Sequence, residues 1–137
     1  MKPKLDFLIL SRDIITDAVT NEASAIRIFD TLYILKGQTS LVYSLAVLGR
    51  VYLNSTGIIP NVQAKLKLSD PSGIEVRTET LNAQNINAEL GVNLNARFML
   101  VLFLSEGRYK IDTSISTNGV DFVDLESPMY FQVKQQI

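Results

Sequence analysis

The chain has 137 residues, of which 47% are hydrophobic, and its 13 basic and 14 acidic residues leave a formal net charge of −1. This length favours one domain spanning residues 1–137, with enough apolar side chains for a sizeable core. The balanced charge excludes the basic field that nucleic acid or an anionic membrane would require, so we expect neither as a partner.

Two residue types that carry much of protein chemistry are absent, because the chain contains no cysteine and no histidine. Disulfides, thiolate nucleophiles, Ser-His-Asp triads and zinc sites of the usual kind are therefore excluded. Carboxylates, lysines and hydroxyl groups remain for catalysis, which is a poor set for an enzyme. We expect no enzymatic activity, no metal site and no cofactor.

The first apolar segment, Leu5 to Ile15, predicts a strand. Asp6 interrupts it, Arg12 follows soon after, and no small-residue cleavage site appears, so the pattern does not fit a signal peptide. The segment is also too short to span a membrane. These features predict a cytoplasmic protein.

Two longer strands are predicted next. A polar connection at Thr16–Glu22 leads into a strand at Ala23–Leu35, which is rich in Ile, Phe and Tyr. After a loop at Lys36–Ser40, the segment Leu41–Leu53 predicts a third strand, with a bulge or bend near Gly49.

The clearest hairpin joins Val62–Leu68 to Ile74–Leu81, because both segments alternate and the turn Asp70–Gly73 reads Asp-Pro-Ser-Gly. The following segment, Asn82–Asn95, has five asparagines and little pattern. An ordinary polar connecting loop is the favoured interpretation; a short strand near Val92–Leu94, a brief helix or a connection crossing between sheets is also open.

The most hydrophobic stretch is Phe98–Leu104, which is continuously apolar and predicts a strand buried on both faces. Tyr109–Ser116 alternates between apolar and polar residues and predicts a neighbouring strand with one face in water. We expect the two to form a hairpin or a sheet corner. Tyr109 follows Gly107 as in the tyrosine corner of Greek-key sandwiches, where the hydroxyl group bonds to nearby backbone.

The last part of the chain predicts two more strands, Val120–Leu125 and Tyr130–Val133, separated by Ser127-Pro128. Before them, Asn118-Gly119 indicates a two-residue hairpin of type I′. Eight or nine strands at short spacing predict an all-β fold, an antiparallel immunoglobulin-like Greek-key sandwich.

Two patches carry a resemblance to a known family: Ile15–Phe29, and Gly107–Ile111 leading through Asn118-Gly119 to Met129–Val133. The chain resembles a family of small bacterial proteins classed as a domain of unknown function. The resemblance implies an immunoglobulin-like sandwich and transfers no functional site. The family favours proline where this chain has Gly37-Gln38-Thr39.

Three sets of residues are candidates for chemistry. Calcium ligands would come from Asp121, Asp124 and Glu126, although these residues lack the fixed spacing of a calcium loop and fit a solvated strand edge better. The second set consists of acidic residues in and after the first strand: Asp13, Asp17, Glu22 and Asp30. They could supply a carboxylate pair for acid–base chemistry, although turn hydrogen bonds and surface ion pairs explain them more simply.

The third set is the asparagines of the least patterned segment, whose amides both donate and accept hydrogen bonds and could hold a sugar or a peptide backbone. The set is Asn82, Asn85, Asn87, Asn93 and Asn95.

The sequence therefore favours a non-enzymatic β-sandwich that binds another protein or itself, since its apolar content exceeds what one small core needs. Two alternatives stay open: a structural subunit of a phage or secretion-type assembly, and a domain that binds carbohydrate or another small ligand.

Overall fold

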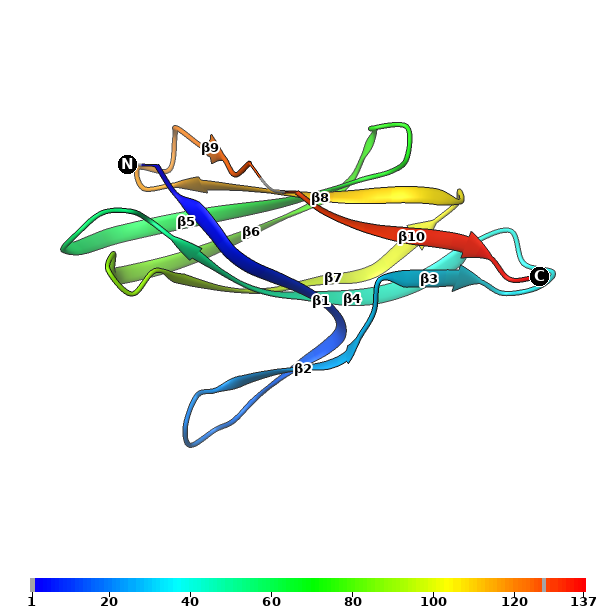
Figure 1. Ribbon diagram of the computed structural model, residues 1–137, viewed down its shortest axis with the longest axis horizontal. Helices are drawn as coiled ribbons and strands as arrows, with labels where there is room; N and C mark the ends of the chain where they lie inside the picture. Colours follow the sequence, from blue (N-terminus) through cyan, green and yellow to red (C-terminus); the bar gives the residue numbers. More distant parts are fainter. Residues whose placement is uncertain (1, 127) are drawn as a thin grey trace.

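The computed structural model describes residues 2–126 and 128–137, and these residues form ten strands in two facing sheets (Figure 1). The predicted all-β sandwich is thus confirmed. In chain order, the strands are β1 (Lys4–Thr16), β2 (Ala23–Ile28), β3 (Thr31–Ile34), β4 (Leu41–Tyr52), β5 (Ile58–Ser69), β6 (Glu75–Asn87), β7 (Val92–Phe103), β8 (Gly107–Ser116), β9 (Val123–Asp124) and β10 (Met129–Gln135).

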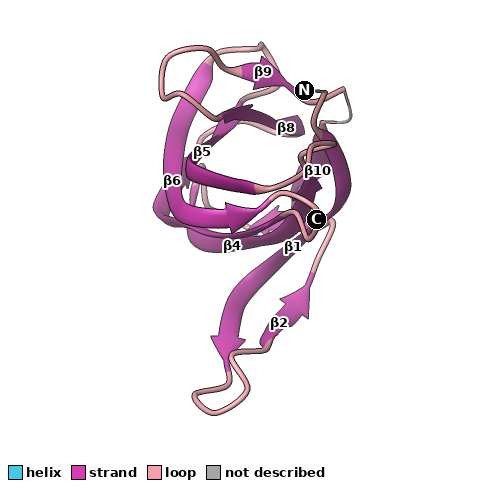
Figure 2. Ribbon diagram, turned by 90° about the vertical axis from the view of Figure 1, so that its left-hand side faces the viewer, coloured by secondary structure: helices cyan, strands magenta, loops and turns pink. Residues whose placement is uncertain are grey.

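We name the two layers sheet A, with strand order β2-β1-β4-β7, and sheet B, with order β3-β10-β8-β5-β6 and the short β9 beside β8. All neighbours are antiparallel except β3 and β10, which run parallel. The end of β1 and the whole of β2 leave the sandwich as a projecting hairpin, which we call the arm (Figure 2).

The arm arises where the sequence predicted one strand at Ala23–Leu35, and that prediction is wrong. The segment forms two strands in different sheets, because β2 pairs with β1 while β3 pairs with β10. The break is at Phe29, whose ring turns inward and packs edge-on against Tyr43 and Phe131. A large aromatic side chain gains more from that burial than from continuing an exposed strand.

The asparagine-rich segment is not a polar loop. Asn82 to Asn87 complete β6, a turn occupies Ala88–Gly91, and Val92 begins β7. Because β6 lies in sheet B and β7 in sheet A, the connection crosses between the sheets, which was one of the open alternatives.

The prediction that Phe98–Leu104 is buried on both faces is also wrong. Phe98, Val101 and Phe103 point into the core, whereas Leu100 is 68% exposed and Leu102 is 47% exposed on the outer side of sheet A. The following alternating segment, β8, lies in sheet B, so the two segments form a corner rather than a paired hairpin.

The hairpin predicted around Asp70–Gly73 is confirmed, and β5 and β6 pair along nearly their whole length. The type I′ turn at Asn118-Gly119 is not found. Only Gly119 of the two has positive φ, and Asn118 Oδ1 accepts hydrogen bonds from the Val120 and Asp121 amides, which builds a longer loop. Of the strand predicted at Val120–Leu125, only β9 remains. The final strand is confirmed as β10; Ser127, in the break predicted before it, lies outside the described residues.

The irregularity predicted near Gly49 lies in the neighbouring strand β1, where the register shifts between Leu5 and Phe7, opposite Val51 and Arg50. A Cβ atom at residue 49 would lie 2.9 Å from the Phe7 carbonyl oxygen and 2.6 Å from Leu8 Cδ1. Glycine therefore lets β1 approach β4 closely at the bulge.

The core between the sheets consists of two groups of buried side chains. The first centres on aromatic rings: Phe131 stacks on Tyr109 at 5.5 Å and contacts Phe103 edge-on at 6.0 Å. The Tyr109 hydroxyl donates to the Ser105 carbonyl oxygen at 2.9 Å, which confirms the predicted tyrosine corner. The second group is aliphatic and includes Leu53 and Leu94.

In the described part of the chain, no helix has the length and hydrophobicity needed to cross a lipid bilayer.

Candidate functional site

The arm projects from the sandwich and contributes little to the hydrophobic core. Its two strands are held to each other by the ladder from Ser11↔Ile28 to Thr16↔Ala23 and extend away from the sandwich (Figure 2). Three of its large apolar side chains are in solvent, since Ile15 is 57% exposed, Val19 at the tip 93% and Ile28 66%, whereas Ile14 is buried. An arm that only had to remain soluble would carry polar residues at these positions.

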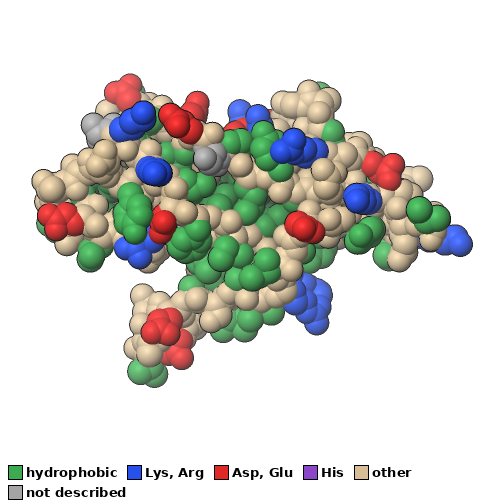
Figure 3. Space-filling view, in the orientation of Figure 1, with side chains coloured by type: hydrophobic (Ala, Val, Ile, Leu, Met, Phe, Trp, Pro, Cys, Tyr) green, Lys and Arg blue, Asp and Glu red, His purple; other side chains and the backbone are tan. Residues whose placement is uncertain are grey.

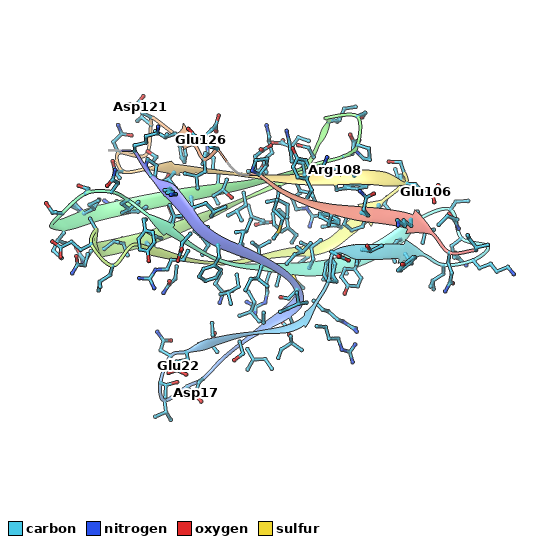
Figure 4. All side chains as sticks on the ribbon, in the orientation of Figure 1. Asp17, Glu22, Glu106, Arg108, Asp121 and Glu126 are labelled. Atoms are coloured by element: carbon cyan, nitrogen blue, oxygen red, sulfur yellow. The ribbon has the colours of Figure 1, made fainter. Side chains whose placement is uncertain are left out.

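The tip of the arm is acidic and contains several local hydrogen bonds. Asp17 Oδ1 accepts from the Val19 and Thr20 amides at 2.8 and 2.9 Å. The Thr20 amide, followed by that of Val19, holds the pKa of Asp17 below its ordinary value of 3.8. Glu22 lies beside Asp17 at the far end of the arm (Figure 4), and residues 16–23 include no lysine or arginine. The tip therefore carries two negative charges at neutral pH.

The outer face of sheet A continues the apolar surface at the root of the arm. Val42 and Leu102 are cross-strand partners, 57% and 47% exposed. Next to them a bulge places two residues of β7, Met99 and Leu100, opposite Ser44 of β4. The Ser44 hydroxyl group accepts from the Leu100 amide at 2.8 Å, and both bulged side chains remain exposed. The bulge therefore turns two large apolar side chains outward.

A crevice of about 740 Å³ lies between the arm and this face, and we call it the root crevice. The arm contributes Arg12, Asp13, Ile26 and Arg27 to its walls. Sheet A contributes the segments 42–45 and 97–100, with Arg97 among them. Figure 3 shows basic side chains on the underside of the sandwich beside the arm, and acidic ones at the far end of the arm.

One arginine of the root crevice fixes the arm to the sheet. Arg97 Nη2 donates to the Ile14 carbonyl oxygen at 2.7 Å and to Asp13 Oδ1 at 3.2 Å. The Ile14 amide, and after it the Arg97 side chain, lowers the pKa of Asp13 below 3.8. Asp13 is thus ionised and already paired, while Arg12 and Arg27 add two further positive charges as cross-strand neighbours on the arm.

Two residues that line the root crevice have strained backbones. Arg27 has φ of 57° and Leu100 has φ of 51°, in the left-handed region that costs a residue with a Cβ atom about 1–2 kcal/mol. Such conformations persist where surrounding structure imposes them and concentrate at functional sites. Here they aim an arginine and a leucine at the same crevice.

The asparagines predicted as ligand-binding residues are only partly brought together. Asn82 of β6 and Asn93 and Asn95 of β7 line a cleft of about 170 Å³ where the two sheets meet, above buried aliphatic side chains. Asn85 stands apart in a left-handed conformation, with φ of 53°. The side chain of Asn87 accepts from the Glu89 amide at 3.1 Å and shapes the turn.

Three of the carboxylates considered for acid–base chemistry are spread along the arm, and the fourth, Asp30, lies between β2 and β3. Asp13 pairs with Arg97, Asp17 orders the tip, and Asp30 accepts from the Thr31 hydroxyl at 3.1 Å. The simpler explanation, turn hydrogen bonds and surface ion pairs, holds for these residues. Glu22 shares the tip with Asp17 (Figure 4).

The residues considered for calcium lie on the other side of the sandwich from the arm (Figure 4). Asp121 accepts from Asn118 Nδ2 at 2.9 Å, and Glu126 lies 3.8 Å from Lys2 Nζ. Asp124 is in β9. Within residues 2–126 and 128–137, no three acidic side chains gather closely enough to hold a metal ion. A groove of about 1040 Å³ at this end is lined by charges of both signs, among them Lys4 and Glu89.

Comparison with known proteins gives little sequence-level information. No family model matches the chain, and no curated protein matches it. Among solved structures, the CARDB domain of the PF1109 protein from Pyrococcus furiosus, crystallised in complex with di-metal ions, matches at 13% identity. The match covers 97% of this chain and 92% of that one, with a TM-score of 0.39. The predicted family resemblance is therefore not supported at the level of sequence.

Sequence reasoning missed the root crevice because its parts come from four separate segments. Arg12 and Arg27 line the same crevice only because β1 and β2 form a hairpin, and Arg97 joins them from β7. The one available signal was the excess of apolar residues, which indicated an interface without locating it.

Proposed function

We propose that this chain is a single, non-enzymatic β-sandwich module that binds another protein through its arm and the outer face of sheet A. The observation that carries the proposal is a group of exposed apolar side chains outside the core, gathered around the root crevice. Ile26 of the arm and Val42, Met99 and Leu100 of sheet A line the same crevice, and the last three are more than half exposed.

The energetics favour a covered surface. Fully burying an isoleucine, leucine, valine or methionine side chain is worth about 1.5–3 kcal/mol, so a partner that covers several of them gains substantial binding energy. An isolated two-stranded hairpin is only marginally stable in water. A partner that packs on the arm would therefore also stabilise it.

A site-resolved cross-linking experiment tests this function. A photoreactive amino acid is placed at Leu102 or Ile28, and at Lys67 on the outside of sheet B as the control, in cells that naturally make the protein. We expect protein adducts from the first two positions and not from Lys67. The adducts should disappear when Met99→Lys is added to a variant that remains folded by circular dichroism. Equal labelling at Lys67 would refute the proposal.

The alternative function, a structural subunit, would use the same surface, because copies in a repeating assembly also need an apolar contact and a projecting element. Such an assembly would give adducts whose mass is a multiple of this chain. The cytoplasmic location expected from the sequence remains a prediction.

A second candidate function is the binding of a small polar ligand between β6 and β7, favoured by the three asparagines that line one cleft. The cleft, at about 170 Å³, is smaller than usual ligand pockets of about 300–1,000 Å³. Titration of the protein with monosaccharides, followed by amide chemical shifts, tests it. Shifts confined to Asn82, Asn93 and Asn95 and abolished by Asn93→Ala would support this candidate, and the absence of shifts would eliminate it.

A further inference from the structure

The two ends of the arm have opposite charge, and both ends expose apolar side chains. At the tip, Asp17 and Glu22 flank the exposed Val19. At the root, three arginines and one carboxylate line a crevice whose remaining walls are largely apolar. Within one molecule these two ends cannot meet, because the arm projects away from the sandwich (Figure 2).

The root crevice has the chemistry that the tip requires. Its one carboxylate, Asp13, already has a partner in Arg97 at 3.2 Å. Arg12 and Arg27 lie on adjacent strands, between the paired positions Ser11↔Ile28 and Asp13↔Ile26, and both line the crevice. Two like charges on neighbouring strands are unfavourable unless an anion lies between or beside them. The exposed side chains of Val42 and Met99 offer an apolar contact for Val19.

We propose that the partner on this surface is a second copy of the chain, whose arm tip occupies the root crevice. The inference rests on the proposed function and names its partner. Glu22 and Asp17 of one copy lie against Arg12 and Arg27 of the other, and Val19 packs on the apolar wall. The complementary charges select the partner and set its orientation.

The dimensions of the arm favour a closed pair. β2 has six residues, so tip and root are about 20 Å apart. Two arms lying antiparallel about a two-fold axis place each tip at the root of the other, so both contacts form at once. Such an isologous interface closes on itself and gives a dimer rather than a chain of copies.

Two charge-changing variants test the pairing without disturbing the fold. The tip variant is Asp17→Asn with Glu22→Lys; asparagine keeps the oxygen that accepts from the Val19 and Thr20 amides. The crevice variant is Arg12→Glu with Arg27→Asp; aspartate tolerates the left-handed backbone at residue 27. Arg97 is left intact because it holds the arm.

The measurement is mass by light scattering over a concentration series, with sedimentation giving the dissociation constant. We expect a wild-type dimer, a dissociation constant raised at least about tenfold in each variant alone, and recovery of the dimer when the two variants are mixed. The matched control, Lys36→Glu with Lys67→Glu, makes the same charge change as the crevice variant at exposed positions away from the arm and should leave the dimer unchanged.

Several outcomes would overturn the inference. These are a wild-type monomer at every concentration, an open series of larger species, or a tip variant that dimerises as well as the wild type while the crevice variant does not. The last result would assign the crevice to a different anion. If the protein is a monomer but Leu102 still gives adducts with another protein, the inference fails while the proposed function stands.

Discussion

The sandwich and the arm show two ways of using apolar residues in one chain. In the sandwich, Phe98, Phe103 and Phe131 are at most 2% exposed and hold two sheets together. On the arm, Ile15 and Ile28 are more than half exposed although they also lie on strands. The core buries these aromatic side chains between the two sheets, whereas Ile15 and Ile28 lie in solvent. The difference gives the proposed interface a definite place, which total apolar content does not.

The largest expected effect is the loss of unfolding free energy when a cavity is made in the core of the sandwich. Phe131→Ala removes a ring that contacts Phe29, Phe103 and Tyr109, and it should cost about 3–5 kcal/mol of unfolding free energy. Ile28→Ala on the arm should change it by no more than about 0.5 kcal/mol. Urea denaturation measures both. A comparable loss in the two variants would show that the arm belongs to the core after all.

A smaller effect is expected at the corner where the chain passes between the sheets. Gly91 has φ of 79°, and a Cβ atom there would lie 2.6 Å from the Val51 carbonyl oxygen. Gly91→Ala should therefore cost about 2 kcal/mol or more of unfolding free energy. Gly73→Ala is the matched control, because Gly73 has φ of 89° and open space around it. It should cost only the backbone term, about 1 kcal/mol. Equal losses would mean that the sheets can separate at this corner.

A weaker, local effect should follow from freeing the arm. Arg97→Ala removes the hydrogen bond to the Ile14 carbonyl oxygen and leaves Asp13 without its guanidinium partner. We expect amide hydrogens of β2 to exchange several-fold faster, while those of β5 and β8 are unchanged. Arg108→Ala, on sheet B, serves as the control. Faster exchange throughout the molecule would contradict the view that the arm opens independently.

The smallest effect is a pH dependence confined to the tip. Asp17 accepts its hydrogen bonds only in the folded arm, and this lowers its pKa below the unfolded value of 3.8. Its contribution to the stability of the arm is therefore fully present above pH 3.8. The contribution is lost as the pH falls through the lower, folded pKa. Amide signals of Val19 and Thr20 should therefore shift below pH 3.8 in the wild type, and this transition should be absent in Asp17→Asn. A transition that persists in the variant would assign the titration to another group.

Much of the fold could be predicted because local pattern and tertiary contact agree in the sandwich. The turn at Asp70–Gly73 and the alternation on either side predict the β5–β6 hairpin, and Tyr109 after Gly107 predicts the tyrosine corner. The failures have a common cause. Phe98–Leu104 appeared buried because apolar residues stand on both faces, and sequence does not distinguish a second core face from an exposed apolar face. The strand at Ala23–Leu35 was overextended because nothing local shows that Phe29 turns inward.

The candidate site was less accessible to prediction than the fold. The asparagines were predicted as ligand-binding residues because five of them occur close together. Asn87, however, forms a hydrogen bond within a turn, and only three of the five line the same cleft. The arginines of the root crevice are single residues in three distant segments. Their common position depends on the register Asp13↔Ile26 and on the reach of Arg97, neither of which composition or spacing encodes.

The parallel pairing of β3 with β10 has a consequence for how the protein is made. Ile34 is aligned with Gln135, so β3 has no strand partner until β10 has been synthesised. Phe29, just before β3, likewise cannot complete its packing until Phe131 has been synthesised. During translation the first third of the chain therefore presents an incomplete sheet edge next to the hydrophobic arm, a combination that favours premature association between nascent chains. Ribosomes that pause between codons 35 and 129 would prolong this exposure, so the timing of synthesis bears on how much of the protein reaches its native form.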